Sequence, residues 1–416
     1  MKVPKTVILY LFLILTATEA TFAVNIKEEK NRILVPGGDS TRLNTFFQKF
    51  DSVSSSKQGR INILHIGGSH VQAGFFTDRV RTNLNEINNQ ERSSPGFIFP
   101  YNIAKTNNPV NYKISYKGNW DAANNIRKNR TIPLGMGGIA VYTKDPESEI
   151  SVSLNVDTYD SRWYFDKLTL IGYIEDGSSD VKPMLKMEDC SYLEAEYDDT
   201  SRVYRFTLPA LTDSFTVVFH QTGSEPHTFI LNGFLPEKDE SGIIYHSIGV
   251  NGAAVPSYIN CENFEEELPL ISPDLVIFAI GINDAVSKKF TEDAFIDNYN
   301  ILIDRILHVN PDCALIFITN NDSYLRVSRR KYAVNRRGQV AQKAFYELAR
   351  QHSGGVWDLF SIMGGLGSMK KWETRGFAKY DKVHFTRSGY ERLGDLFYSA
   401  LIEYYRKIDF NGQKAV

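Results

Sequence analysis

Cysteine is scarce in this sequence, and an excess of charge of either sign is missing. The 416 residues include 3 cysteines, Cys190, Cys261 and Cys313, and carry a formal net charge of -2. Three widely separated cysteines fit neither a disulfide framework nor a metal-binding motif; one disulfide remains open but is not expected. Cys313 lies in an apolar run and is expected to be a buried small hydrophobic residue. The charge balance lacks the basic excess that nucleic-acid binding requires.

The N-terminal segment has the pattern of a secretory signal. Two lysines precede a short apolar core from Val7 to Leu15, and small residues follow at Ala20 and Ala23. This core is too short for a comfortable membrane span, so we expect removal of residues 1–23, with a retained anchor as the alternative. The protein is therefore expected to be secreted or periplasmic, with no stable membrane span. The remaining chain is long enough for two modules with their own cores.

Strand and helix patterns alternate in two parts of the chain. After a helical pattern in Thr41–Phe50, the apolar run Ile61–Ile66 leads into a Gly-Gly-Ser turn and a helical pattern in Phe75–Leu84. A strand, a tight turn and a helix form the first unit of an open parallel sheet. The alternation then resumes, with strands predicted at 243–248, 275–280, 314–319 and 356–359 and helices at 292–308, 332–352 and 388–406. We expect a three-layer α/β/α domain whose site lies at the C-terminal ends of its strands.

The segment between these two parts has a different rhythm. Runs at 150–156, 167–173, 202–208 and 214–220 alternate apolar and polar residues, and turn clusters such as 176–180 separate them. Short strands at this spacing indicate a β-sandwich. The sequence thus predicts an α/β domain in two parts, 24–136 and 237–416, with an all-β sandwich inserted at 137–236.

A serine and an acid–histidine pair have the residue types of a nucleophilic hydrolase. Ser69 follows the first predicted strand, and His384 comes three positions after Asp381, just ahead of the last predicted helix. A serine hydroxyl needs a base, and a histidine base needs a carboxylate to orient its ring and stabilise its cation. Taken singly, each residue has a structural alternative, because serine often caps helices and a loop histidine can do the same.

Gly252 and Asn283 are candidates for stabilising negative charge. An oxyanion needs two or three donors already aimed at it, and losing one typically costs roughly 3 kcal/mol of transition-state stabilisation. The glycine lets its backbone N–H approach closely, and the asparagine supplies an amide after a buried strand. Each is equally well explained in isolation as a turn residue.

The order of these residues along the chain resembles that of the SGNH (GDSL-type) esterase superfamily. The resemblance covers about residues 60–85 and 243–407. It implies that Ser69 is the nucleophile, His384 the base and Asp381 its orienting acid. The backbone N–H groups of Ser69 and Gly252 and the side chain of Asn283 would form the oxyanion hole. It rests on four blocks, Gly67-Gly68-Ser69-His70, Gly249-Val250-Asn251-Gly252, Gly281-Ile282-Asn283-Asp284 and Asp381-Lys382-Val383-His384-Phe385.

One position departs from the family pattern. Members usually have an aspartate immediately before the serine, and this chain has Gly68. That aspartate is not the acid of the triad, so the catalytic parts are all present. Glycine makes the turn more flexible and removes a local hydrogen-bonding group, which favours lower activity or altered substrate placement.

Within the superfamily, the chain is most similar to exported peptidoglycan O-acetylesterases with a carbohydrate-binding-like sandwich. This similarity rests on the stretch Leu64–Ala73 and on the inserted β-rich segment, after which the chain returns to the α/β domain through Gly242–Gly252. The resemblance implies an exported serine esterase that removes O-acetyl groups from a polysaccharide, with peptidoglycan as first candidate, without a metal or organic cofactor. Two alternatives stay open: a polysaccharide O-acetyltransferase with the same triad, and a catalytically weak glycan-binding protein on this scaffold. The polymer, the acetylated position and the oligomeric state stay open as well.

Two clusters are candidates for substrate binding. Trp163 and Tyr164 would offer aromatic faces to sugar rings, although a sandwich core is the more common role for such a cluster. Arg329 and Arg330 belong to a basic run that would attract an anionic glycan, although a solvated surface is the more common explanation for such a run.

Overall fold

The computed structural model describes residues 27–87, 94–156, 163–223, 225–239, 241–329 and 331–408. The predicted signal, residues 1–23, lies outside these ranges. Within the described ranges, no helix is long and apolar enough to cross a membrane. All three cysteines are described and free, and Cys313 is fully buried as predicted.

A six-stranded sheet forms the centre of the α/β domain. Its strands run in the order β1 (Ile33–Leu34), β19 (Gly355–Trp357), β16 (Ala314–Ile318), β15 (Leu275–Ala279), β2 (Arg60–Gly67) and β14 (Gly242–Gly249). All neighbours are parallel except the short edge strand β1, which is antiparallel to β19. The central strands are nearly continuous apolar runs because helices cover both faces.

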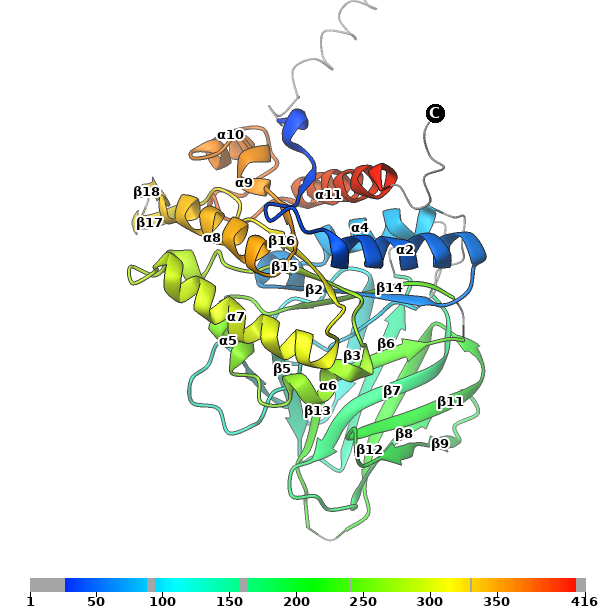
Figure 1. The fold of residues 1–416 in the computed structure, drawn as a ribbon. Coiled ribbons are helices and arrows are strands. Elements are labelled where there is room, and N and C mark those ends of the chain that lie inside the picture. Colours follow the sequence, from blue (N-terminus) through cyan, green and yellow to red (C-terminus); the bar gives the residue numbers. More distant parts are fainter. Residues whose placement is uncertain are drawn as a thin grey trace, which may run out of the picture.

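Side chains alternate between the two faces of this sheet. In β2, Ile61 and Ile63 pack with the apolar residues of α2 (Thr41–Ser56), α4 (Phe75–Glu86) and α11 (Arg387–Lys407). Leu64 and Ile66 pack on the other face, in the cluster that includes residues of α7 (Glu292–Val309) and α8 (Arg337–Gln351). The three-layer α/β/α fold is therefore confirmed (Figure 1).

Two antiparallel sheets form the inserted β domain, which is also confirmed. One sheet has the order β10-β11-β7-β13-β5-β4 and the other β3-β6-β12-β8-β9. The strands are β3 (Tyr112–Lys117), β4 (Asp121–Asn124), β5 (Ile139–Thr143), β6 (Glu147–Leu154), β7 (Phe165–Ile174), β8 (Val181–Lys186), β9 (Tyr192–Glu194), β10 (Glu196–Asp198), β11 (Val203–Thr212), β12 (Ser214–Gln221) and β13 (Phe229–Glu237). Strands β3 and β4 precede residue 137, so the antiparallel pairing starts upstream of the predicted insertion.

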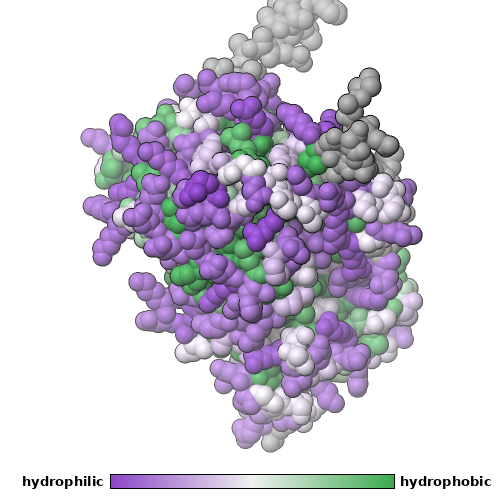
Figure 2. Space-filling model, viewed as in Figure 1, coloured by the Kyte–Doolittle hydropathy of each residue, from purple (hydrophilic) through white to green (hydrophobic). Residues whose placement is uncertain are grey.

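The sandwich packs directly against the α/β domain. One hydrophobic cluster runs from Leu64 and Ile66 of β2 through Phe97 and Ile98 to Phe234 of β13. An isolated bridge pairs Ile98 with Phe234 in the same region. The two modules therefore share a core. On the face shown in Figure 2, hydrophilic residues dominate and apolar ones form small separate patches.

The predicted helix at 332–352 begins later than expected. Strands β17 (Tyr324–Ser328) and β18 (Lys331–Val334) pair as a hairpin, and α8 starts at Arg337. The burial of β18 alternates with a period of two, which is a strand pattern. The short helices are α3 (Ser69–Gln72), α5 (Val255–Ile259), α6 (Phe264–Glu267), α9 (Leu359–Ile362) and α10 (Ser368–Thr374), with 3-10 turns at Glu28–Lys30, Leu268–Leu270 and Asp284–Val286.

Candidate active site

Three strands deliver the candidate residues to one edge of the parallel sheet. Gly67 at the end of β2 pairs with Gly249 of β14 on one side and with Ala279 of β15 on the other. Ser69, Gly252 and Asn283 each follow one of these strand ends within a few residues. Because the carboxyl ends of parallel strands share an edge, the three loops converge there (Figure 1).

The structure places Ser69, His384 and Asp381 in a chain of hydrogen bonds, with His384 between the other two. The Ser69 Oγ lies 2.8 Å from His384 Nε2, and His384 Nδ1 lies 2.9 Å from Asp381 Oδ2. This is the geometry in which an imidazole can accept the serine proton while a carboxylate orients its far nitrogen. The His384 side chain is 35% exposed and that of Asp381 43%, so the triad is accessible from solvent.

Asp381 is held as an anion by its own loop. Burial opposes its ionisation, but hydrogen bonds from the His384 ring and from the backbone N–H groups of His384 and Val383 outweigh that effect and keep the pKa of Asp381 well below its usual range. Both N–H groups donate to Oδ1, at 2.9 and 3.0 Å, which leaves Oδ2 for the imidazole. A carboxylate that stays charged can stabilise an imidazolium.

The candidate oxyanion donors gather around the serine turn. Ser69 is the first residue of α3, so its N–H lies at a helix N-terminus. Gly252 has a φ of 85°, a left-handed conformation that glycine adopts without strain. The Asn283 amide donates to the Ala253 carbonyl at 2.9 Å, which fixes its orientation and leaves a second N–H on the same nitrogen. Sequence reasoning named these three donors, and the loops that carry them meet here.

Gln72 is a positioning residue that the sequence analysis did not identify. It is 2% exposed and follows Ser69 on α3. Its side-chain oxygen accepts the Asn251 N–H at 2.7 Å, and its amide donates to the Thr106 hydroxyl and the Asn107 carbonyl at 2.9 and 3.0 Å. Gln72 therefore ties the serine helix to the loop that presents Gly252. The position of Gln72 one helical turn after Ser69 was the sequence feature that could have indicated this role.

Asp284 connects the loop that carries Asn283 to the loop that carries Gly252. Its carboxylate accepts the Val255 N–H at 3.2 Å, at the start of α5. Burial raises the pKa of Asp284 to about 6, against the lowering effect of this hydrogen bond. The sequence analysis included Asp284 in the block Gly281–Asp284, but it did not predict a bond to Val255, which is 29 positions away.

His70 lies beside His384 and is bonded to Tyr390. Its Nδ1 is 2.7 Å from the Tyr390 hydroxyl, and its ring centroid is 5.4 Å from that of His384. Burial, with the neighbouring His384 as the second cause, lowers the pKa of His70 to about 3. The imidazole of His70 is therefore neutral near pH 7 and adds no positive charge beside the triad.

Gly68, at the position where an aspartate is usual in the resembling family, leaves space beside the oxyanion donors. A Cβ at this position would lie 3.5 Å from both the Asn283 amide nitrogen and the Ala253 carbonyl. These are ordinary contact distances. Gly67 is different, because a Cβ there would lie 2.3 Å from Val71 Cγ2 and 2.9 Å from the Ala279 carbonyl. The first glycine of the pair is therefore sterically required, and the second is not.

The candidate substrate-binding residues are not brought together. Trp163 is 1% exposed in the sandwich core, so its ring cannot stack on a sugar; the core alternative describes it better. Tyr164 next to it is 36% exposed. Arg329 is exposed on the β17–β18 hairpin, and Arg330 lies outside the described residues.

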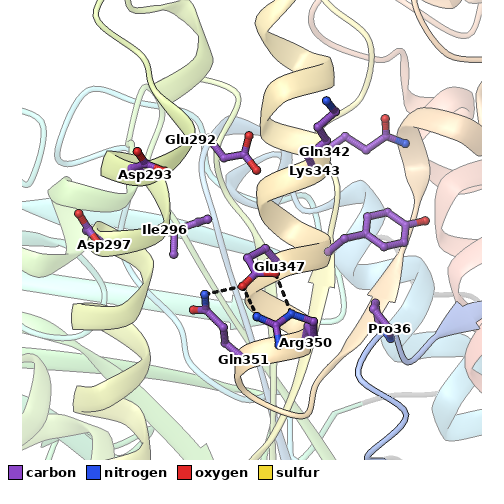
Figure 3. Close-up of a pocket in the computed structure, with 11 residues that line it drawn as sticks. Pro36, Glu292, Asp293, Ile296, Asp297, Gln342, Lys343, Glu347, Arg350 and Gln351 are labelled. Atoms are coloured by element: carbon purple, nitrogen blue, oxygen red, sulfur yellow. Dashed lines mark hydrogen bonds and ion pairs between the residues drawn. The ribbon is translucent and has the colours of Figure 1, made fainter.

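A surface groove lies away from this site, between α7 and α8. It has a volume of about 800 Å³ and is lined by side chains that include Glu292, Asp297, Tyr346 and Glu347 (Figure 3). Arg350 and Gln351 bond to Glu347 within this groove. None of the lining residues belongs to the triad or its oxyanion donors. In the described ranges, no group of three or more His, Cys, Asp and Glu side chains could hold a metal ion.

Comparisons with known proteins bear on the family and the fold. A profile of the GDSL-like Lipase/Acylhydrolase family matches residues 213–392. No curated protein sequence matches the chain. A solved structure described as a peptidoglycan O-acetylesterase in action is similar with a TM-score of 0.73 and 21% identity, over 90% of this chain and 99% of that one.

Two further solved structures overlap a smaller part of the chain. An acetyl xylan esterase has a TM-score of 0.30 and 18% identity, over 38% of this chain and 80% of that one. A GDSL-like lipase from Bacteroides thetaiotaomicron has a TM-score of 0.29 and 19% identity, over 39% of this chain and 76% of that one.

Proposed function

Because the resemblance of this chain to the GDSL/SGNH hydrolase family is confirmed, we propose that it is a serine esterase that removes O-acetyl groups from a polysaccharide, with peptidoglycan as the first candidate. The observation that carries the proposal is the Ser69–His384–Asp381 chain of hydrogen bonds, at 2.8 and 2.9 Å. Three potential oxyanion donors lie on loops from the same sheet edge.

The proposed reaction uses these groups in two steps. His384 takes the proton of Ser69 as the hydroxyl attacks the acetyl carbonyl, and Asp381 stabilises the imidazolium that forms. The N–H groups of Ser69 and Gly252 and the side chain of Asn283 stabilise the oxyanion. The sugar hydroxyl then leaves with a proton from His384, and water hydrolyses the acetyl-enzyme by the same route.

A polymer-borne ester is the proposed substrate because the triad is open to solvent. The side chains of His384 and Asp381 are each more than a third exposed, so an acetyl group projecting from a large glycan could reach Ser69. The structural likeness to a peptidoglycan O-acetylesterase over 90% of the chain supports the choice of polymer. Export is part of the proposal, since peptidoglycan lies outside the cytoplasmic membrane and residues 1–23 have the pattern of a signal.

A substrate panel with the serine variant as the blank tests the proposal. Released acid is measured with acyl esters of increasing chain length and with O-acetylated peptidoglycan, xylan and chitooligosaccharides. The expected result is acetate release that is fastest on O-acetylated peptidoglycan and absent in Ser69→Ala, whose far-UV circular dichroism matches the wild type. Acetate release that persists in Ser69→Ala would contradict the mechanism.

The same panel separates the competing functions. Acetyl transfer to an added oligosaccharide that outpaces hydrolysis would indicate an acetyltransferase. A preference for long acyl chains would indicate a lipid esterase. Binding of glycan by both proteins, with no release of acid by either, would indicate a glycan-binding protein on a hydrolase scaffold.

A further inference from the structure

A buried lysine lies inside the loop that carries the base and its acid. Lys382 sits between Asp381 and His384 and is 7% exposed. Removing an ammonium group from water is unfavourable unless it is paired and hydrogen-bonded. A lysine in this position is therefore expected to have specific partners, and the structure shows four contacts.

The Lys382 ammonium lies between two aromatic rings. Its Nζ is 4.7 Å from the centroid of the Tyr332 ring and 4.5 Å from that of Tyr380, and the two rings meet edge to face at 5.8 Å. It also lies 3.5 Å from a carboxylate oxygen of Glu373 and donates to the Tyr380 carbonyl at 3.1 Å. Ring faces and carboxylate together replace the lost hydration of the cation.

These partners come from three separate parts of the chain. Tyr332 lies on β18, Glu373 on α10, and Tyr380 on the same loop as Lys382. Figure 1 shows the β17–β18 hairpin next to α10. A further bond joins the hairpin to the loop, because the Tyr324 N–H donates to the Lys382 carbonyl at 3.1 Å. The ammonium therefore fastens the catalytic loop to two elements outside it.

The backbone of this loop needs such a fastening. Lys382 has a φ of 57°, a left-handed conformation that is unfavourable for a residue with a side chain. This conformation lies within the turn in which the Val383 and His384 N–H groups both reach Asp381 Oδ1. The Lys379 N–H closes the loop by donating to the His384 carbonyl at 2.7 Å.

We propose that Lys382 is a positioning residue, whose ammonium, clamped by Tyr332, Tyr380 and Glu373, holds the loop in the one conformation that aligns Asp381 and His384 with Ser69. The inference rests on the proposed esterase function. Lys382 does not touch the reacting atoms; it acts through the loop that carries them.

A matched pair of lysine variants tests the clamp. Lys382→Met keeps the aliphatic stem and removes the charge, whereas Lys379→Met removes an exposed charge from the same loop. With a small acetyl ester, Lys382→Met is expected to lower kcat by about 10- to 100-fold with KM within about twofold of wild type, because a misplaced base slows chemistry more than binding. Lys379→Met is expected to match wild type, because it keeps the backbone N–H that donates to the His384 carbonyl. Lys382→Arg, which retains a cation for the two rings, is expected to be more active than Lys382→Met.

A second measurement reports the alignment without activity. The proton between His384 Nδ1 and Asp381 is expected to give a downfield proton NMR signal in wild type and Lys379→Met, and to broaden or vanish in Lys382→Met. Equal kcat and equal signals in the two methionine variants would overturn the inference. If Lys382→Met does not fold, Tyr332→Leu removes one ring of the clamp from outside the loop, and an unchanged kcat and signal in that variant would overturn it equally.

The failure of the proposed function would look different. In that case wild type itself would show no Ser69-dependent acetate release. The NMR comparison would still decide whether Lys382 holds the loop.

Discussion

The adjacent glycines Gly67 and Gly68 are predicted to differ in their tolerance of the same substitution, a change to alanine. A Cβ added at Gly67 would lie 2.3 Å from Val71 Cγ2 and 2.9 Å from the Ala279 carbonyl oxygen. The first contact is far inside van der Waals distance, and the second involves backbone of the neighbouring strand β15. A Cβ added at Gly68 would meet nothing closer than 3.5 Å. Both glycines have negative φ, so contact with neighbours decides the outcome rather than left-handed strain.

The expected magnitudes follow from these contacts. Forcing a methyl group into a packed site typically costs about 1–3 kcal/mol of folding free energy, so Gly67→Ala should lower the melting temperature. Relief of the clash must move Val71, which is on the helix that begins with Ser69. A shift of about 1 Å at a catalytic group costs on the order of 100-fold in rate. Gly68→Ala should leave the melting temperature within a degree or two and kcat within about fivefold.

Acetate release and thermal unfolding of the two variants, measured side by side with wild type, check this prediction. Both substitutions add one methyl group, so a difference between the two variants reports where the methyl group is added and not what is added. If Gly67→Ala were as active and as stable as Gly68→Ala, the packing of the serine turn against Val71 and β15 would be described wrongly.

Three further predictions concern residues around the site and the shared core. Glu267 is buried where α6 meets Met136 and Asn232, and burial raises its pKa from 4.5 to about 7. The folded protein then keeps the proton of Glu267 between pH 4.5 and 7 while the unfolded chain loses it. The contribution of Glu267 to the unfolding free energy should therefore fall by up to about 3 kcal/mol as pH rises through this window. Denaturant titrations should show the unfolding free energy of wild type falling by this amount relative to that of Glu267→Gln, and a difference that stays constant with pH would contradict it. Gln72→Ala should lower kcat about tenfold by releasing the loop that presents Gly252; equal kcat in Gln72→Ala and wild type would refute the link. Asp284→Ala should cost about 1–3 kcal/mol by leaving the Val255 N–H unpaired, more than Asp284→Asn, and equal unfolding midpoints for the two variants would count against it.

The parallel sheet and the candidate catalytic residues could be predicted because their signals are local. Ser69 comes directly after a continuous apolar strand, and Asn283 follows another, so placing the strands also placed the residues that follow them. Asp381 and His384 are three positions apart, so one loop determines their geometry. Most of the chain's α/β elements therefore appear at the expected places.

The missed features depend on contacts between distant segments. The clamp around Lys382 needs Tyr332 from the hairpin and Glu373 from α10, and no local pattern links these three residues. The second strand of the hairpin, β18, was included in the helix predicted at 332–352, and its strand conformation depends on pairing with β17. For Trp163 the sequence left a sugar platform open beside the more common role in a core, and the structure shows that this side chain is buried.

The central claim is that Ser69 is a nucleophile activated by His384, and covalent labelling tests it most directly. The protein is treated with a fluorophosphonate, digested, and searched by mass spectrometry for the modified peptide. We predict one adduct on the peptide that contains Ser69, absent in Ser69→Ala and strongly slowed in His384→Ala. No adduct on wild type, or one that forms equally fast in His384→Ala, would contradict it.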